Sequence, residues 1–552
     1  MIGVVARESD RALVPEFFQL FKTPWEFYRP GGRYDVIIAS SEFEEDPHPP
    51  VLMVYGSEPG RLDDAGSFRR ESAAEGVRVV WREKGVPIYG GLLTFEASGD
   101  PLIRLEGTKR PAVVTRSADG RKILRIGFDL FREVEFLIRS GQPIEHAQTP
   151  TLELHIAMLR DLILMAGVAL VEIPPVPARH TFIACLTHDV DFAGIRRHKL
   201  DHTMFGFLYR ALFHSLLRVL KSDLSWGKLW KNWLAAVSLP LVYLGVAKDF
   251  MVHFDRYVEI EGALPSTFFF IPFKNSPGRC PEGEAPRKRV AKYDVTEISP
   301  DVRMLASKGK EVALHGLDAW LDVEAGREEL KRLQGVCAEA SAGVRMHWLY
   351  FSGRSPAILE KAGFAYDTTS GYNGVVGYRS GTAQVFRHPG TERMFELPLH
   401  VMDTALFLPA RMALTQAAAY DIVGKMMTDV STYGGALTLN WHCRSLGPER
   451  FWDDFYSRML SEMKERGAWF GSAEQVVRWF GKRRSVTFHS VRSQGSGVEV
   501  DLSCGPWEEG PDLVLRVHAP DDGTRRDGNP EPKIVTRDIP IHGDFRQRVS
   551  LS

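Results

Sequence analysis

The sequence has few cysteines, a balanced charge and no uncharged stretch long enough to cross a bilayer. Its five cysteines are scattered and form no Cys-x-x-Cys pair, so a disulfide framework is not expected and a reducing compartment, the cytoplasm, fits. The first residues lack a basic segment followed by an apolar core, which argues against a cleaved signal peptide. With 69 Lys and Arg against 70 Asp and Glu, the totals give no electrostatic reason to expect a nucleic-acid partner.

The composition is that of a globular chain with several domains. The 552 residues are 44% hydrophobic and 25% charged, which allows a sizeable core and about three or four domains. Residues 1–172 predict an α/β domain, with buried strands at 34–41 and 51–57 and a helix at 151–170. This domain contains no G-x-G-x-x-G or G-x-x-x-x-G-K loop, so its role stays open. The proline-rich residues 172–180 predict a linker.

Residues 180–482 alternate between strand-like and helix-like segments. Helical patterns at 325–340 and 449–466 favour a parallel sheet, either open or closed into a barrel. In both arrangements the chemistry lies at the carboxyl ends of the strands. After this domain, residues 485–552 predict a small all-β appendage of short strands and Gly, Pro and Asp turns. The strand-like runs of the central region are 182–191, 266–273, 311–316, 394–399 and 435–442.

One apolar run ends abruptly in polar residues. Phe182–Leu186 is followed by Thr187, His188, Asp189, Val190 and Asp191. Residues i and i+2 of a strand point to the same side, so the two carboxylates are expected to converge while His188 points away. Paired carboxylates serve one metal ion, or divide into a metal ligand and a general base. The alternative is a pair of loop carboxylates that cap the next helix.

Three further apolar runs end at or near a histidine, namely His315, His347 and His442. A lone histidine at a strand end is usually structural, but a parallel sheet would bring all three to the same rim as Asp189 and Asp191. Histidine and aspartate suit zinc or a similar divalent ion, and three protein ligands leave one position open. The remaining carboxylate and histidine could then act as base and acid in metal-assisted acyl hydrolysis.

With these motifs, residues 180–482 resemble the polysaccharide deacetylase family, the carbohydrate esterases with a NodB-homology domain. The resemblance implies a distorted (β/α) barrel, so the predicted fold class is α/β: this barrel, an N-terminal α/β domain and a small C-terminal all-β appendage. The family's first motif, Thr-Phe-Asp-Asp, is matched by Thr187–Asp191 in an Asp-Val-Asp variant. By this match Asp189 is the catalytic base and Asp191 a metal ligand.

The next two motifs are matched incompletely. Of the motif His-Ser/Thr-x-x-His only His315 is present, because Ala319 stands where the second histidine belongs. The motif Arg-x-Pro-aromatic is matched by Arg345–Trp348, with His347 in place of the proline. We infer that His347 supplies the lost metal ligand, with Asp318 as the alternative.

The resemblance also implies a cofactor and further roles. The cofactor would be a divalent metal, of which zinc is the usual one in the family, and it would be held by Asp191, His315 and His347. Arg345 would orient the base, and His442, after the last apolar strand, would be the catalytic acid. Residues 363–382 resemble the family's Gly-Tyr-x-x-Asp stretch beside the site, and Asp403 could touch substrate or orient His442. The predicted substrate-binding residues are Trp348, Asp367, Tyr372, Asp403 and Trp441.

A helical insertion at 195–247 separates the first motif from the next strand. Its uncharged run, 233–247, has fifteen residues, short of the ~20 that span a bilayer. Three interpretations compete: a lid over the site, a membrane-surface helix pair formed by 204–247, and a dimer contact. The membrane interpretation would place the protein at the inner membrane surface, acting on lipid-linked glycans before export.

The predicted function is metal-dependent removal of acetyl groups from an N-acetylated sugar or glycan, in polysaccharide or cell-envelope glycan metabolism. The alternative is an inactive deacetylase-like module that binds glycan or serves as a scaffold, which the half-matched second motif would explain. A third hypothesis is hydrolysis of a cyclic or linear amide that is not a sugar. The expected partner is therefore the glycan or amino-sugar substrate.

Overall fold

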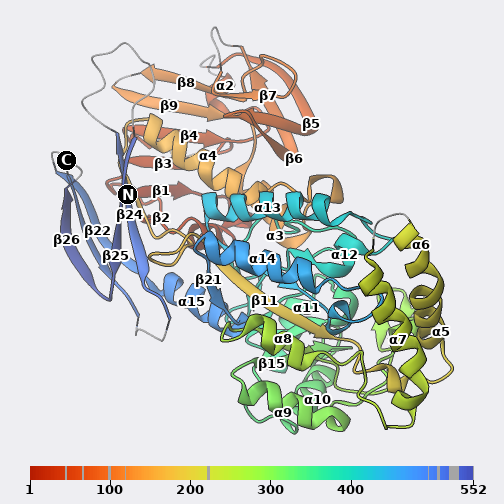
Figure 1. Ribbon diagram of the computed structural model, residues 1–552. Helices are drawn as coiled ribbons and strands as arrows, with labels where there is room; N and C mark the ends of the chain where they lie inside the picture. Colours follow the sequence, from red (N-terminus) through yellow and green to blue (C-terminus); the bar gives the residue numbers. More distant parts are fainter. Residues whose placement is uncertain are drawn as a thin grey trace.

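The computed structural model describes residues 1–43, 47–64, 68–96, 101–118, 120–220, 224–494, 497–505, 510–520 and 534–550. These residues form an N-terminal α/β part, a central sheet wrapped by helices, and C-terminal antiparallel sheets that lie beside the N-terminal part (Figure 1). The predicted α/β class with these three parts is confirmed.

The N-terminal part is built on a six-stranded sheet in the order β2-β1-β3-β4-β9-β8. Its strand pairs are parallel except for β8 and β9. A second, antiparallel sheet, β6-β5-β7, adjoins it. The predicted helix at 151–170 ends earlier, because Gly167 adopts a left-handed conformation with φ 92°. The elements are β1 (Ile2–Val5), α1 (Val14–Leu20), β2 (Trp25–Phe27), β3 (Val36–Ser40), β4 (Val51–Tyr55), α2 (Arg61–Asp64), β5 (Arg70–Trp81), β6 (Lys84–Phe95), β7 (Ile103–Leu105), β8 (Val113–Ala118), β9 (Arg121–Ile126), α3 (Leu130–Arg139) and α4 (Thr151–Met165).

The central sheet follows the order β18-β17-β16-β15-β12-β11-β20-β19, with β21 also paired to β11, and every neighbouring pair is parallel. All residues of β11 are buried, as expected of a parallel strand covered on both faces. The strands are β11 (Ile183–Val190), β12 (Thr267–Phe270), β15 (Glu311–Gly316), β16 (Gly343–Met346), β17 (Tyr366–Asp367), β18 (Phe395–Glu396), β19 (Val401–Met402), β20 (Ala436–Asn440) and β21 (Trp469–Gly471).

The two edges of this sheet lie close together in the chain. The edge strands β18 and β19 are separated only by residues 397–400, a segment that spans at most ~18 Å. The sheet is therefore curled until its edges approach, which confirms the predicted distorted barrel. Because its strands are parallel, their carboxyl ends share one rim. The helices around it are α8 (Phe254–Glu261), α9 (Ser299–Ser307), α10 (Val323–Gln334), α11 (Ser355–Ala362), α12 (Asp403–Phe407), α13 (Gln416–Tyr433), α14 (Asp453–Glu465) and α15 (Ala473–Ser485).

The C-terminal residues form two three-stranded antiparallel sheets, β22-β23-β26 and β10-β24-β25. Strand β10 follows the last helix of the N-terminal part and ends at residue 172. The linker predicted at 172–180 therefore begins within a β-sheet. Residues 172–178 are buried, and the segment is a packed connection rather than an exposed one. The strands are β10 (Leu170–Glu172), β22 (Thr487–Gln494), β23 (Gly497–Ser503), β24 (Leu513–Pro520), β25 (Ile534–Ile541) and β26 (Phe545–Ser550).

The insertion after β11 folds as a helical hairpin at one end of the barrel (Figure 1). Its first arm joins α5 (His202–Tyr209), a π-helical turn (Arg210–His214) and α6 (Ser215–Leu220), and its second arm is α7 (Trp226–Tyr243). The arms pack through a small apolar cluster of their own. Among the described residues, none of the helices combines the length and hydropathy that crossing a membrane requires.

Candidate metal centre

The predicted metal and catalytic residues meet at the carboxyl rim of the barrel. Asp189 and Asp191 lie at the end of β11, His315 in β15, His347 just after β16 and His442 just after β20. All five line one cavity of about 600 Å³. The parallel register of the strands explains this convergence, since each residue follows the same edge of the sheet.

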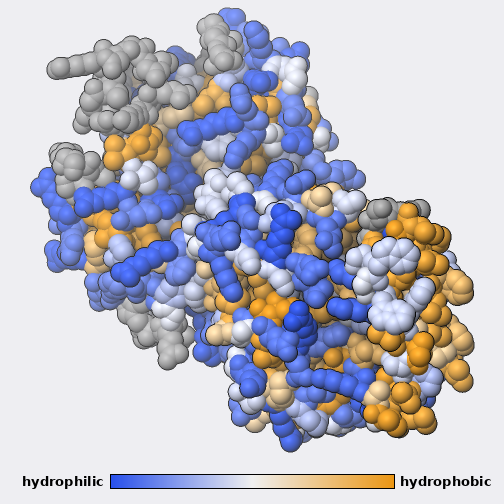
Figure 2. Space-filling model, in the orientation of Figure 1, coloured by the Kyte–Doolittle hydropathy of each residue, from blue (hydrophilic) through white to orange (hydrophobic). Residues whose placement is uncertain are grey.

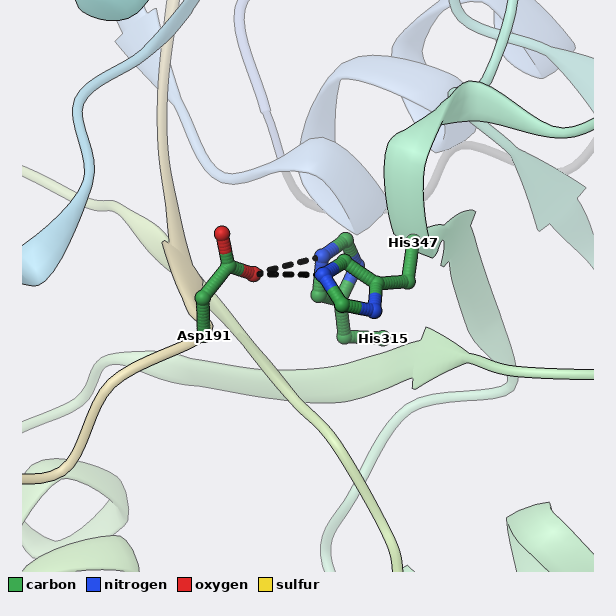
Figure 3. Close-up of side chains that lie close together, drawn as sticks. All are labelled: Asp191, His315 and His347. Carbon is green, nitrogen blue, oxygen red and sulfur yellow. Dashed lines mark ion pairs between the residues drawn. The ribbon is translucent and has the colours of Figure 1, made fainter. Parts of the chain in front are cut away.

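Asp191, His315 and His347 form a cluster that could hold a metal ion (Figure 3). The Asp191 Oδ1 atom lies 3.1 Å from Nε2 of His315 and 3.6 Å from Nε2 of His347. One ligand atom from each residue lies within 4.8 Å of the other two. The alternative ligand, Asp318, instead accepts a hydrogen bond from the Arg279 backbone N–H at 2.6 Å.

The hydrogen bonds around the cluster leave its ligand atoms unsatisfied. His315 Nδ1 lies 2.9 Å from the Arg345 carbonyl oxygen, so this nitrogen carries the proton and Nε2 presents a lone pair. That lone pair faces Asp191 Oδ1, a buried atom with no hydrogen-bond partner among the described residues. Lone pairs that face each other repel unless a cation lies between them. The donor set therefore fits a divalent ion with one Asp and two His ligands.

The electrostatics of the cluster agree with this fit. Burial lowers the pKa of His347 well below its ordinary value, so the imidazole is neutral, as a ligand must be. Burial opposes ionisation of Asp191, but the three neighbouring histidines hold the pKa of this carboxyl well below its usual range. The cluster therefore offers a carboxylate from Asp191 and a neutral imidazole from His347.

The alternation of side chains in β11 produces the predicted division of roles. His188 points away from the cavity, with Nε2 2.7 Å from Glu261 Oε1 and Nδ1 2.8 Å from the Trp441 carbonyl oxygen. Val190 is fully buried on that same side of the strand. Asp189 and Asp191 consequently face the cavity together.

Asp189 is held by two side chains, one from the adjacent strand β20 and one from β16 across the barrel rim. Arg345 Nη1 donates to its Oδ1 at 2.9 Å, and Asn440 Nδ2 donates to its Oδ2 at 2.7 Å. Arg345 also donates to Thr187 Oγ1 at 2.7 Å, and its guanidinium lies over the Phe269 ring. The arrangement fixes the orientation of the Asp189 carboxylate beside the metal cluster. Arg345 thus contacts the residue that it is predicted to orient.

His442 lines the same cavity next to Asp191. Its Nδ1 lies 2.6 Å from Asp403 Oδ1, and its backbone N–H donates to Asp403 Oδ2 at 2.7 Å. Burial alone would lower the pKa of His442, but Asp403 and the other carboxylates raise it to about 9. Its Nε2 lies 3.7 Å from Asp191 Oδ2. A protonated imidazole is thus poised at the metal cluster.

Of the predicted substrate-binding residues, only Trp348 lines the cavity. Asp367 is fully buried beside Thr369, and the Tyr372 hydroxyl donates to the Gln142 carbonyl oxygen at 2.6 Å. The Trp441 ring is fully buried and stacks on Phe455. These assignments were wrong, because neighbouring residues at a strand end point to opposite faces.

Asp403 is fully buried and contacts His442, which is the second of the two roles expected for it, and it does not line the cavity. The sequence interpretation missed Asn440, two residues before the predicted acid His442. Asn440 could have been predicted from its position at the end of β20, because its side chain lies on the same face of the sheet as the rim residues of β11. The cationic rim of the cavity was missed as well. It is formed by Arg287, Lys288, Lys292 and Arg411.

Comparison with known proteins gives distant structural likenesses only. No family profile and no curated protein sequence matches the chain. A candidate polysaccharide deacetylase from Mycobacterium smegmatis is 18% identical over 56% of this chain and 95% of its own, with a TM-score of 0.36. An allantoinase is 12% identical over 55% and 92%, with a TM-score of 0.34.

A second candidate polysaccharide deacetylase, from Pseudomonas aeruginosa PAO1, is 14% identical over 42% of this chain and 73% of its own, with a TM-score of 0.31. Two of the three structures carry the family name that the sequence motifs predict. At this distance, the chemistry of the site has to be derived from the residues of this chain.

Proposed function

We propose that the protein is a metal-dependent hydrolase that removes an acetyl group from the nitrogen of a sugar or glycan. The observation that supports this most directly is the placement of two charge-paired groups around one ligand cluster. Asp189, paired with Arg345, has its Oδ2 3.8 Å from Nε2 of the ligand His315, and His442, paired with Asp403, has its Nε2 3.7 Å from Oδ2 of Asp191. Such a site supplies a base and an acid to the two ends of one hydrolysis.

The metal would be held by Asp191, His315 and His347, with zinc as the ion that this donor set suits best. When bound, a divalent ion polarises the substrate carbonyl and makes water easier to deprotonate. All three ligands line the cavity, so an ion held by them would be accessible to a substrate bound there.

Asp189 would act as the base and take a proton from the attacking water. Its carboxylate is oriented by hydrogen bonds from Arg345 and Asn440. His442 would act as the acid, donating the Nε2 proton to the leaving amine. Asp403 fixes the Nδ1–H of that ring and stabilises its charged form. Water adds to the amide, and the products are acetate and the free amino sugar.

The test of this proposal combines metal content with turnover. Purified wild-type protein is analysed by inductively coupled plasma mass spectrometry and then screened for acetate release from N-acetylated oligosaccharides. About one zinc, cobalt or nickel per chain together with acetate release supports the proposal. Bound metal without acetate release from any N-acetylated glycan contradicts it. Absence of metal after incubation with excess zinc would instead favour the non-catalytic glycan-binding module.

A further inference from the structure

Each arm of the helical hairpin has two apolar faces. One face is buried between the arms, through Met204, Phe207 and Ala211 on the first arm and Ala235 and Leu239 on α7. The opposite face carries large apolar side chains that are exposed to solvent. They are Phe205, Tyr209, Phe213, Leu217 and Leu220 on the first arm, and Trp226, Trp230, Leu234, Val237, Leu241 and Leu244 on the second.

This exposure is confined to one region of the molecule. Apart from Met1, Ile144 and Leu321, every large hydrophobic side chain found exposed in the described part of the chain lies between Leu200 and Val246. Figure 2 shows the hydrophobic residues gathered at the end of the molecule that carries α5, α6 and α7. Single exposed apolar residues are ordinary, but a continuous patch of this size marks an interaction surface.

The hairpin is not a lid that packs on the site. It reaches the cavity only through residues at the start of the first arm, namely Asp201, His202 and Thr203. None of the exposed apolar residues lines that cavity. The predicted lid would bury its apolar residues over the cavity, whereas these residues face solvent. The surface therefore requires an external occupant.

The charges of the hairpin favour a lipid surface over a second copy of the chain. Residues 202–247 contain five Lys or Arg and one Asp. Arg210 is paired with Glu449 and Lys228 with Asp454, whereas Lys231 is exposed beside the apolar face. In a symmetric dimer the same patch would face itself and bring like charges together. Anionic lipid headgroups would complement these charges instead. The exposed rings of Trp226 and Trp230, beside exposed Lys231, suit the boundary between headgroups and acyl chains.

We propose that the α5–α7 hairpin lies on the surface of a bilayer that contains anionic headgroups, with its exposed apolar face among the acyl chains. The helices lie parallel to the surface, because neither has the properties of a spanning helix. The cavity opens beside the root of the hairpin, so docking would hold the metal centre next to the headgroups.

Vesicle flotation tests this docking with the full chain. Wild-type protein is mixed with vesicles of phosphatidylcholine alone and, separately, with vesicles in which about a third of the lipid is the anionic phosphatidylglycerol. The protein is expected to float with the anionic vesicles and to bind more weakly as salt is raised. A triple variant, Phe213→Ser/Leu217→Ser/Trp230→Ser, should bind the anionic vesicles at least about tenfold more weakly than wild type.

The matched control carries Ile144→Ser and Leu321→Ser, two exposed apolar residues away from the hairpin, and should bind like wild type. All substituted side chains are exposed, and thermal melts of the variants establish that they are folded. Wild-type protein that fails to float, or a triple variant that floats equally well, overturns the proposal. So does a wild-type dimer in sedimentation velocity that the triple variant converts to monomer while neither protein binds vesicles.

A separate observation concerns the cationic residues that line the cavity. Arg287, Lys288, Lys292 and Arg411 line it, and within the described residues none of them forms an ion pair with a carboxylate. The lining carboxylates have other partners: Asp189 contacts Arg345, and Asp201 contacts His198. Lys288 also lies 5.6 Å from the Trp348 ring centroid. Unpaired cations around a cavity attract an anionic ligand.

Resting on the proposed function, we infer that the acetylated sugar carries a negatively charged group, which this rim binds. Calorimetry compares N-acetylglucosamine, its 1-phosphate and an N-acetylated uronic acid, with acetate release measured in parallel. Tighter binding of either anionic sugar, about tenfold or more, and its loss in Lys288→Gln/Arg411→Gln supports the inference; the two sugars distinguish phosphate from carboxylate. Equal binding of neutral and anionic sugars overturns it, whether or not acetate is released.

Discussion

Asn440 holds Asp189 at two points. Its Nδ2 donates to Asp189 Oδ2 at 2.7 Å, and its Oδ1 accepts from the Asp189 backbone N–H at 3.1 Å. This double contact fixes the orientation of the amide, since a flipped group would point its oxygen at the carboxylate and its NH₂ at the backbone N–H. Arg345 holds the other oxygen of the same carboxylate. Three strands of the barrel thus position one carboxylate.

The change Asn440→Asp should abolish most of the activity and leave the metal in place. It puts a second carboxylate against Asp189 and replaces a donated hydrogen bond with repulsion, which raises the proton affinity of the base. We expect kcat/KM to fall by about 10²-fold and its acidic limb to move to higher pH. A variant with wild-type kcat/KM, or one that loses its metal, would contradict the positioning role.

The change Asp189→Asn should preserve metal content and remove turnover. The amide keeps the size of the side chain and its contact with Arg345, but it cannot accept a proton. A loss on the order of 10³-fold in kcat is expected for removal of a general base. The comparison is metal content by mass spectrometry beside initial rates of acetate release. Turnover near the wild-type rate would reassign the base.

The change His347→Ala should remove the metal. His347 supplies one of only two histidines in the ligand cluster, and two remaining ligands bind a divalent ion weakly. His202→Ala is the matched control, because His202 is exposed and lines the cavity without belonging to the cluster. Metal retained at the wild-type ratio in His347→Ala would indicate a different ligand set.

A pH effect on stability is expected from Glu396, which lies beside Asp367 in the register of β17 and β18. Burial raises the pKa of Glu396 from 4.5 to about 7, although the Ser370 backbone N–H and the charges of Arg345 and Arg379 oppose the rise. Between those pH values the folded state binds more protons than the unfolded state, so stability falls as the pH rises. The contribution is on the order of 3 kcal/mol at most.

Glu396→Gln should therefore flatten this part of the stability curve and stabilise the protein at pH 8. In the wild type the Ser370 backbone N–H donates to Glu396 Oε1 at 2.7 Å. The side-chain oxygen of glutamine can still accept this hydrogen bond. Urea unfolding at pH 5 and pH 8 measures the effect, with the exposed Glu392→Gln as control. Parallel stability curves for wild type and Glu396→Gln would show that Glu396 does not titrate as described.

The sequence was informative where local pattern decides structure. The predicted strand at 311–316 has the bounds of β15, and alternation placed Asp189 and Asp191 on one face of β11. The same alternation, applied to 440–442, would have separated Asn440 from Trp441. The predicted ligand His347 lies in the cluster because the strand before it, β16, pairs with β15, which carries His315.

Pairing between distant segments could not be predicted in this way. The helix predicted at 151–170 ends early because of Gly167, which is a local effect. The residues after it form strand β10 only because they pair with β24, far along the chain. Likewise, the hydropathy of residues 204–247 is compatible with a buried core, a lid or an exposed face. Only the packing of the two arms shows which stripe of each helix is covered.

The pairing of β10 with β24 has a consequence for how the chain folds as it is made. Glu172 lies at the start of the segment that enters the barrel, and its carboxylate is satisfied by Arg160 and by His518, which is 346 residues further on. During synthesis β10 must wait without its partner strand until nearly the whole polypeptide has left the ribosome. Loss of the last few dozen residues would then leave a strand without its partner at the junction of all three parts. Nascent chains that stop short of β24 should therefore depend on chaperones.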